Sequence, residues 1–294
     1  MKKLVAVCTA FCALTLPAIA ADLSVSPLGT YTPPRPIYTW TGCRIGVNIG
    51  GGSARTSWND PLGTFGVTPA GAPVGTPAGV PVYLGDHTAS GVVGGGQLGC
   101  DYQVGQFVFG IQGLYDLTGM KASNIQGQPT TIPRTEFNTG FNVFLINNTF
   151  IQSTANITGR IGYAVQPNLL LYAKGGVAWN HNLYNVQHPN LQASTVAPLP
   201  TGVGSVTLTL PPGLIVALGN DSRVGPLVGT GLEWAVFGTD VSLFLEYDYM
   251  HFGTQRVTFL STLLGTKTFP VDITQNVNMV LFGINYRFFG GPQF

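Results

Sequence analysis

The chain has 294 residues, and only 9% of them are charged, against about 25% in an ordinary soluble domain. In contrast, 45% are hydrophobic, and glycine occupies 40 positions, about twice its usual share. The 13 basic residues nearly balance the 12 acidic ones, so no basic surface for nucleic acid is indicated. An ordinary soluble domain and a nucleic-acid-binding protein are therefore both disfavoured.

The first twenty residues have the three parts of a secretory signal peptide. Lys2 and Lys3 precede the apolar run LVAVCTAFCALTL, and Ala18-Ile19-Ala20 is a small-x-small cleavage site. The apolar run is shorter than the roughly eighteen residues that a membrane-spanning helix needs. We therefore expect a signal peptide over residues 1–20 and export of the mature chain, which begins with a proline-rich periplasmic lead-in over residues 21–39.

From residue 40 onward one pattern repeats along the chain. About ten residues of alternating apolar and polar side chains are followed by a turn or a loop, and such period-two alternation is typical of β-strands. The predicted strands are about 41–53, 89–102, 106–118, 153–165, 169–183, 223–235, 241–253 and 276–288.

The predicted connections alternate between short and long. Tight turns are expected near VGQ, QPN and FGTD, and long loops at about 54–88, 120–152, 185–221 and 254–275. This is the plan of an outer-membrane barrel, the closed sheet that an exported apolar chain without a spanning helix requires. We predict an all-β fold: an eight-stranded antiparallel up-and-down transmembrane β-barrel over residues 40–294, in the outer membrane of a Gram-negative bacterium. The loops are unusually apolar, which suggests that the strands extend above the bilayer.

The two faces of the predicted strands differ in charge. One face has no Asp, Glu, Lys or Arg away from the strand ends, because the charged residues gather on the other face. They are Arg44, Asp116, Arg160, Lys174, Glu233, Glu246, Asp248 and Arg287. A basic side chain facing lipid at mid-depth costs roughly 2–4 kcal/mol, so these residues should point into the lumen. An eight-stranded barrel is just wide enough for side chains to fill. We predict a structural charge network in which Glu246 or Asp248 pairs with one of the four bases.

Two alternatives to this charge network follow from the same residues. Carboxylates two positions apart, such as Glu246 and Asp248, also suit acid–base catalysis, but in a lumen we favour a charge-paired core. A water-soluble lipocalin-like barrel would have its apolar residues inside, so the alternation argues against it. The apolar face should instead carry the aromatic girdles of a membrane barrel. The predicted girdle residues are Trp40, Tyr102, Trp234, Tyr286 and Phe288 near the turns, and Trp179 and Tyr249 toward the loops.

Several blocks of this chain resemble the alphaproteobacterial outer-membrane immunogenic protein family. They are YTWTGCRIGVNIGGG, GGGQLGCDYQ, GRIGYAV, LLYAKGGVAW, GTGLEWA, LEYDYMHFG and FGINYRF, in order over about residues 40–288. The resemblance implies an eight-stranded barrel of the OmpA-like membrane-domain type, often labelled porin family, that contributes to envelope integrity and presents surface loops. It also implies a signal for the barrel-insertion machinery at Gly283, Tyr286 and Phe288, with Phe294 as a second terminal aromatic.

Only two of the four cysteines, Cys43 and Cys100, remain after the signal peptide is removed. The family's blocks more typically carry aromatics at these positions. The two cysteines lie on the same face near the periplasmic ends of neighbouring predicted strands, so a disulfide is geometrically reasonable in an oxidising compartment. Two free thiols facing lipid are the alternative.

The remaining motifs do not indicate chemistry. GGGQLG matches a dinucleotide-binding pattern, but a strand follows it where that motif needs a helix. The four histidines, at positions 87, 181, 188 and 251, fit no standard metal-site spacing.

We therefore predict a non-enzymatic monomer without metal, cofactor or nucleic acid. Its expected partners are outer-membrane lipid, the insertion machinery and a host or environmental ligand at the loops. The alternatives are a narrow porin for small solutes, a haem-binding, ligand-binding or adhesive surface protein, and a lipid-modifying enzyme built around His251.

Overall fold

The computed structural model describes residues 38–62, 81–126, 130–131, 140–141, 145–188, 191–199, 202–210, 214–262 and 268–288. The predicted signal peptide, residues 21–37 of the predicted lead-in, and Phe294 lie outside these ranges. Within them, no helix is long and apolar enough to cross a membrane.

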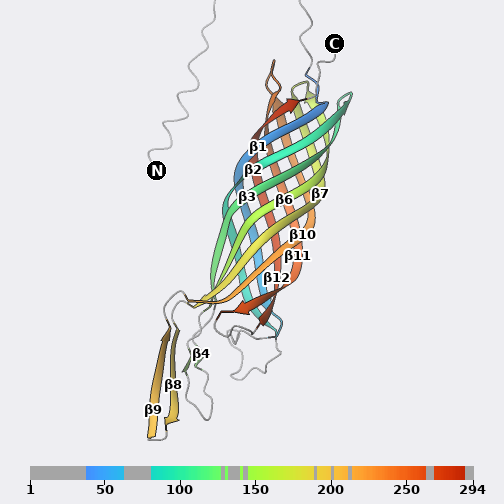
Figure 1. Ribbon diagram of the computed structural model, residues 1–294. Coiled ribbons are helices and arrows are strands. Elements are labelled where there is room, and N and C mark those ends of the chain that lie inside the picture. The colour runs from blue at the N-terminus through green and yellow to red at the C-terminus, as the bar shows by residue number, and fades with distance from the viewer. Residues whose placement is uncertain are drawn as a thin grey trace, which may run out of the picture. The chain divides into compact units, whose positions relative to one another are not determined.

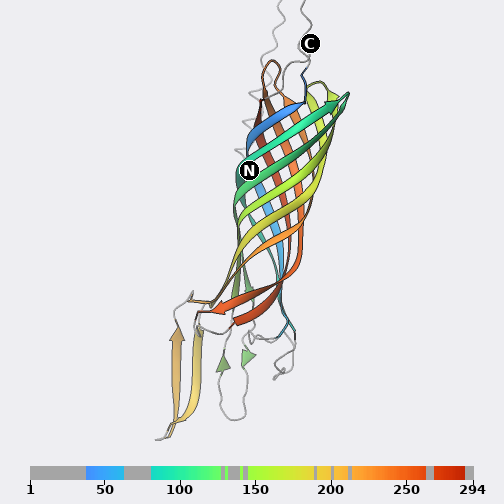
Figure 2. The same ribbon diagram turned by 45° about the vertical axis from the view of Figure 1, so that its right-hand side comes forward.

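Eight long antiparallel strands form a closed barrel (Figure 1). They are β1 (Gly42–Asp60), β2 (Val82–Val104), β3 (Phe107–Gln126), β6 (Leu145–Gln166), β7 (Leu169–His188), β10 (Leu214–Ala235), β11 (Val241–Ser261) and β12 (Thr268–Phe288). Each strand pairs with the next long strand along the chain, and β1 pairs with both β2 and β12, which closes the ring. Figure 2 shows the strands winding obliquely around this wall. The predicted eight-stranded up-and-down barrel is confirmed.

Four shorter strands form a separate sheet that was not predicted. They are β4 (Thr130–Thr131), β5 (Gly140–Phe141), β8 (Leu191–Leu199) and β9 (Gly202–Leu210), in the order β4-β5-β8-β9. These strands fall within the predicted loops 120–152 and 185–221. Because β5 pairs with β8, the sheet joins two loops that are distant in the sequence.

The short turns lie where the sequence predicts them, at residues 105–106, 167–168 and 236–240. At this end of the barrel the observed strand bounds stay within two residues of the predicted ones. At the loop end, every strand runs five to nine residues further than predicted. A strand of 21 residues such as β11, tilted by about 40°, rises roughly 50 Å, about twice the apolar band of a membrane barrel. The barrel is therefore taller than the membrane.

The outer face of the wall changes character partway along every strand. From the turn end, its outward side chains are mostly apolar or glycine, as in Ile45, Val47 and Ile49 of β1. We call these positions the membrane band. The band ends at a polar ring: Ser53, Ser90, Lys121, Ser153, His181, Ser222, His251 and Asn278. Among the described residues, no outward Asp, Glu, Lys or Arg lies on the strands within the band. We call the strands beyond the ring, toward the loops, the upper barrel.

The girdle prediction is wrong for Trp40. Tyr102, Trp234, Tyr286 and Phe288 are exposed on the outer face, and so is Trp179, but Trp40 is 0% exposed. Its ring lies 4.9 Å from that of Tyr38, and its backbone N–H donates to Gln103 Oε1 at 2.7 Å. Residue 40 precedes β1, and Gly42 has a φ of 140°, which favours glycine. Strand alternation therefore does not extend back to Trp40.

The lumen is packed in layers along its length. At the turn end, Tyr38 and Trp40 pack near Val108, Leu170 and Ala235. Charged residues follow, and beyond them comes an apolar layer that includes three methionines, Met120, Met250 and Met279. Inside the upper barrel an aromatic and aliphatic core encloses Trp58, Tyr184 and Phe259. Buried side chains thus occupy the lumen at each of these levels.

Candidate functional site

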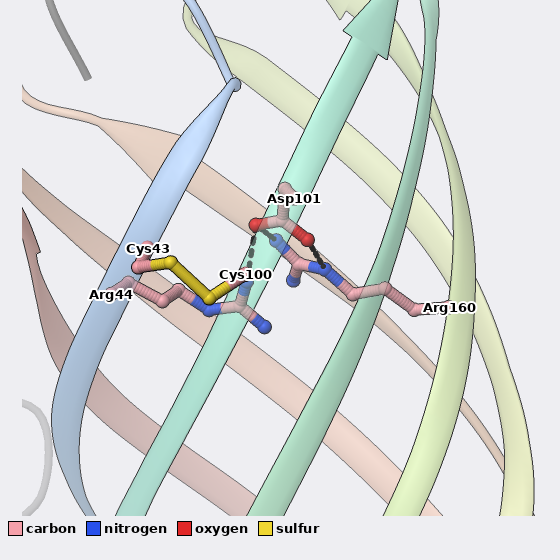
Figure 3. The surroundings of a disulfide bond; sticks show 5 residues. All are labelled: Cys43, Arg44, Cys100, Asp101 and Arg160. Atoms are coloured by element: carbon pink, nitrogen blue, oxygen red, sulfur yellow. Dashed lines mark hydrogen bonds and ion pairs between the residues drawn. A yellow bond between two sulfur atoms is a disulfide. The ribbon is translucent and has the colours of Figure 1, made fainter. Parts of the chain in front are cut away.

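The most distinctive chemistry of the described chain is the group of charged residues inside the membrane band. Asp101 of β2 lies between Arg44 of β1 and Arg160 of β6, as Figure 3 shows. Arg160 bonds Asp101 with two nitrogens, Nε to Oδ1 at 2.7 Å and Nη2 to Oδ2 at 2.5 Å, and Arg44 Nη1 bonds the same carboxylate. A second acid, Glu233 of β10, accepts from Arg160 Nη1 at 2.9 Å. Two bases and two acids therefore form a neutral, fully buried cluster.

Amide side chains extend this cluster around the wall. Arg44 donates to Gln112 at 2.8 Å, and Gln112 donates to Gln97 at 2.8 Å. Gln97 in turn donates to Asn285 of β12 at 2.6 Å. Glu233 closes the circuit by accepting from Asn285 at 2.9 Å and from the Ser242 hydroxyl at 2.6 Å. The hydrogen bonds of this one layer join seven of the eight strands.

A second cluster lies on β7 and β11 and contains the two neighbouring carboxylates, Glu246 and Asp248. Both are paired with the same base. Lys174 Nζ lies 2.5 Å from Glu246 Oε1 and 2.8 Å from Asp248 Oδ2. The Tyr172 hydroxyl donates to Glu246 Oε2 at 2.7 Å, and the Arg160 guanidinium lies 4.9 Å from the centre of the Tyr172 ring. Tyr172 thereby joins the two clusters and brings the eighth strand, β7, into the network.

All eight charged residues named from the sequence face the lumen. Six of them form the ion pairs above, whereas Asp116 and Arg287 do not. Asp116 is buried with no ion pair recorded in the described part of the chain. Arg287 lies at the turn end, where it donates to the Thr39 carbonyl and stacks over the rings of Tyr38 and Trp40.

Sequence reasoning missed three members of the lumen network. Asp101 was placed on the inner face by its alternation but was left out of the charge set, although it is the acid that two arginines share. Tyr172 was assigned to the same face as Lys174, but it was left out of the network because it is uncharged. Arg223, whose Nε lies 2.6 Å from Asp221 Oδ2, is the first residue of the predicted strand 223–235 and was not included in the charge set. For Asp101, strict use of the period-two pattern would have been enough.

An inward glycine makes room for the second cluster. A Cβ atom on Gly229 would overlap the carboxylate of Asp248, and it would lie 2.9 Å from Lys174 Cε. Any side chain at this position would therefore displace the Lys174–Asp248 pair or the backbone of β11.

Cys43 and Cys100 form a disulfide between the directly opposed residues of β1 and β2 (Figure 3). Cys43 and Cys100 lie on the outer side of the wall, whereas the adjacent Arg44 and Asp101 point inward. The covalent link and the Arg44–Asp101 ion pair therefore hold the same two strands from opposite faces.

The histidines do not converge on one site. His87 bonds Thr149 Oγ1 at 2.7 Å, and His181 bonds Ser222 Oγ at 3.0 Å. The recorded partner of His251 is Asn276 Oδ1, at 2.6 Å, rather than a serine or an acid. Among the described residues, no group of His, Cys, Asp and Glu is arranged to hold a metal ion.

The upper barrel has its own electrostatics. Arg55 pairs with Asp86 at 2.9 Å, and Arg256 pairs with Asp272 at 2.7 Å, on the exposed outer face. Hydrogen bonds from Tyr83, Ser57 and Arg55 lower the pKa of Asp86 to about 2. Burial lowers the pKa of His87, beside the Trp58 ring, to about 4, so its ring is neutral at pH 7.

A closed ring of eight antiparallel strands, apolar outside over one band and ionic inside, defines a transmembrane β-barrel of the outer-membrane class. Consistent with this class, residues 83–292 match the OmpA-like transmembrane domain family model. The chain belongs to this family, and it is a protein of the Gram-negative outer membrane. No curated protein matches the chain.

Solved structures with a similar wall include three outer-membrane proteins. Ail, the attachment invasion locus protein of Yersinia pestis, is 10% identical with a TM-score of 0.33, over 84% of this chain and 100% of that one. The protease OmpT of Escherichia coli is 11% identical with a TM-score of 0.42, over 85% and 98%. OprG of Pseudomonas aeruginosa is 12% identical with a TM-score of 0.37, over 84% and 97%. These identities are too low to transfer a function.

Proposed function

We propose that this barrel is a non-enzymatic structural protein of the envelope, closed to solutes, that presents the upper barrel and its loops at the cell surface. The observation that carries the proposal is the hydrogen-bonded layer of Arg44, Asp101, Arg160 and Glu233. These charges are fully desolvated and lie across the lumen. A water-filled pore would have to break this layer and leave buried charges without partners, which costs several kcal/mol.

A narrow porin is the competing function, and single-channel recording in planar bilayers separates the two. We expect the refolded barrel to insert without discrete conductance steps. Gel mobility before and after boiling, on the same preparation, verifies that the barrel was folded. Steps of uniform size from folded protein would contradict the closed-barrel proposal and support the porin.

A contribution to envelope integrity has a direct test in cells. A strain lacking the protein should be more sensitive to detergent, and wild-type protein should restore resistance. An Arg160→Leu variant, which leaves Asp101 and Glu233 without their shared base, should fold less well and restore less. Restoration by a correctly inserted barrel lacking its loops would show that the wall, rather than the surface segments, carries this role.

We also propose that the insertion machinery recognises the end of β12. Tyr286 and Phe288 are outward-facing aromatics at the turn end, and the inward Gly283 lies beneath the Phe244 ring. If the insertion machinery recognises this end of β12, a variant that lacks residues 289–294 should still insert into the membrane. Loss of insertion in that variant, and equally in a full-length Phe294→Ala variant, would point to Phe294 instead.

A further inference from the structure

A groove lies on the outer wall where the membrane band meets the upper barrel. It has a volume of about 1240 Å³ and is lined by residues of β3, β6, β7, β10 and β11. Four of its apolar side chains, Phe150, Leu183, Leu218 and Leu260, lie beyond the polar ring, on an outer face that is otherwise largely polar. Leu218 and Leu260 are about half exposed and directly opposed across β10 and β11. The apolar surface thus continues past the ring on this side of the wall.

A second hollow, a trough, lies on the membrane band next to this groove. It has a volume of about 890 Å³, and nearly all of its exposed lining is apolar. Its floor is low because Gly96 and Gly113 face outward without side chains, while Val47, Ile157 and Trp179 rise beside them. A Cβ on Gly96 would have its nearest neighbour at 3.5 Å, so close packing inside the wall does not require a glycine there.

The trough and the groove adjoin at one residue of β3. Tyr115 lines both, and the outward residues of β3 lead from Gly113 through Tyr115 and Leu117 to Lys121. Eight residues of a tilted strand rise about 20 Å along the bilayer normal, slightly more than the roughly 15 Å hydrocarbon depth of one leaflet. One path therefore runs from the bilayer interior to the headgroup level.

The charges at the upper end of this path are unbalanced. The groove lining contains Lys121 and His181 and no Asp or Glu. Lys121 is exposed and has no recorded ion pair within the described chain, unlike Arg55 and Arg256 on the same outer face. A cation at headgroup depth above an apolar trough is complementary to a lipid with an acidic headgroup.

We propose that this surface is a selective binding site for an anionic, phosphate-bearing lipid of the outer leaflet. The acyl chain lies in the trough over Gly96 and Gly113, and the phosphate lies in the groove beside Lys121 and His181. The site is an addition to the proposed envelope role and does not depend on it. It requires only that the chain spans the outer membrane.

Quenching of Trp179 fluorescence by brominated lipid can measure lipid binding in the trough. Trp179 lines the trough and is 38% exposed, Trp40 and Trp58 are sealed in the lumen, and Trp234 is the other outward tryptophan. The Trp234→Phe variant, in which Trp179 is the remaining outward tryptophan, is reconstituted into bilayers of phosphatidylcholine and phosphatidylglycerol. In one sample the acyl chains of phosphatidylcholine carry bromine, and in the other those of phosphatidylglycerol do. We expect brominated phosphatidylglycerol to quench Trp179 with a relative affinity about two- to fivefold higher than brominated phosphatidylcholine, the range of one exposed ion pair.

Two variant pairs locate the site. Lys121→Gln should reduce the preference for phosphatidylglycerol to about one, whereas Arg55→Gln, on β1 outside the groove, should leave it unchanged. Gly96→Leu should fill the trough and reduce quenching by both lipids. Gly51→Leu is its matched control, because Gly51 also faces outward with no atom within 4 Å of its Cβ position and lies outside the trough.

Three results would overturn the proposal. Equal quenching by the two lipids, or a preference that survives Lys121→Gln, would show that the site does not select an acidic headgroup. Weak quenching by both lipids that falls as the protein-to-lipid ratio rises would show that a second copy covers the trough. Loss of the preference on adding inorganic phosphate at constant ionic strength would show a site for a free anion rather than for a lipid.

Discussion

The membrane band and the upper barrel share the same eight strands but have opposite chemistry. In the band, the outer face is apolar and the lumen holds Arg44, Asp101, Arg160 and Glu233. In the upper barrel, ion pairs such as Arg256–Asp272 lie outside, and Trp58, Tyr184 and Phe259 pack inside. The pairing register between β1 and β12 continues through both regions without a shift.

The comparison shows that strand geometry sends successive side chains to opposite faces in both regions. Whether the inward side chains are polar or apolar depends on the solvent around the wall. A strand always sends successive side chains to opposite faces. Where lipid surrounds the wall, the polar residues must turn inward and satisfy one another. Where water surrounds it, the apolar residues turn inward and form an ordinary hydrophobic core. The stability of the band should therefore depend on ion pairing, and that of the upper barrel on packing.

The largest effect should follow from removing the acid that two arginines share. Asp101→Leu leaves Arg44 and Arg160 buried with one acid, Glu233, between them, and breaking a buried pair costs roughly 3–5 kcal/mol. We expect the temperature at which the barrel loses its folded gel mobility to fall sharply. Asp272→Asn, which breaks an exposed pair of the upper barrel, should cost at most about 1 kcal/mol. Equal melting of the two variants would contradict an ion-dependent band.

Removing a large side chain from the upper core should have a comparable but local effect. Trp58 is fully buried and contacts the rings of Tyr184 and Phe259, so Trp58→Ala should cost about 3–5 kcal/mol of packing. Because the band does not depend on this core, we expect protease cleavage of the upper strands while the folded gel mobility persists. Trp179→Ala, which removes an outward tryptophan, is the control and should leave the upper strands protected. Joint loss of both regions in Trp58→Ala would show that they unfold as one unit.

The same division explains what could be read from the sequence. The turn-end strand bounds and the inward position of all eight charged residues followed from the cost of exposing charge to lipid. The loop-end bounds did not, because in β12 the residues Val271 and Ile273 face inward while Asp272 and Thr274 face outward. In the upper barrel the apolar residues therefore face inward and the polar ones outward, the reverse of the membrane band. Segments of this kind were assigned to loops because strands were expected to have an apolar outer face.

The contacts within the lumen were less predictable than its composition. Alternation places Lys174, Glu246 and Asp248 inside, but the choice of Lys174 as their common base depends on the stagger between β7, β10 and β11. The inward position of Trp40 was hidden for a different reason, since it precedes the first strand. The period-two pattern specifies a face only where a strand exists.

Substitution of an inward glycine of the band should lower stability moderately, whereas substitution of an outward glycine should not. Gly229→Val places a branched side chain against Asp248 and Lys174, and overpacking of this kind costs about 1–3 kcal/mol. Gly159→Val adds the same atoms at an outward position with nothing within 4 Å, so we expect nearly unchanged stability. Melting followed by gel mobility compares the two variants directly. If Gly159→Val were as destabilising as Gly229→Val, the cost would come from the backbone rather than from the charge cluster.

The smallest effect should be a pH dependence confined to the upper barrel. His87 is held neutral by burial, with its pKa lowered from 6.5 to about 4, so the unfolded segment binds a proton in a pH range where the folded segment does not. Stability is then fully present above about pH 6.5 and decreases as the pH falls toward 4. Asp86 cannot produce this change, because its pKa is lowered to about 2 and its contribution is lost only at more acidic pH. Hydrogen exchange of the upper strands should therefore accelerate between about pH 7 and pH 4.5, after correction for the intrinsic rate. His87→Gln, which can still bond Thr149 without titrating, should remove this acceleration. Acceleration that persists unchanged in His87→Gln would contradict the assignment of the titrating group to His87.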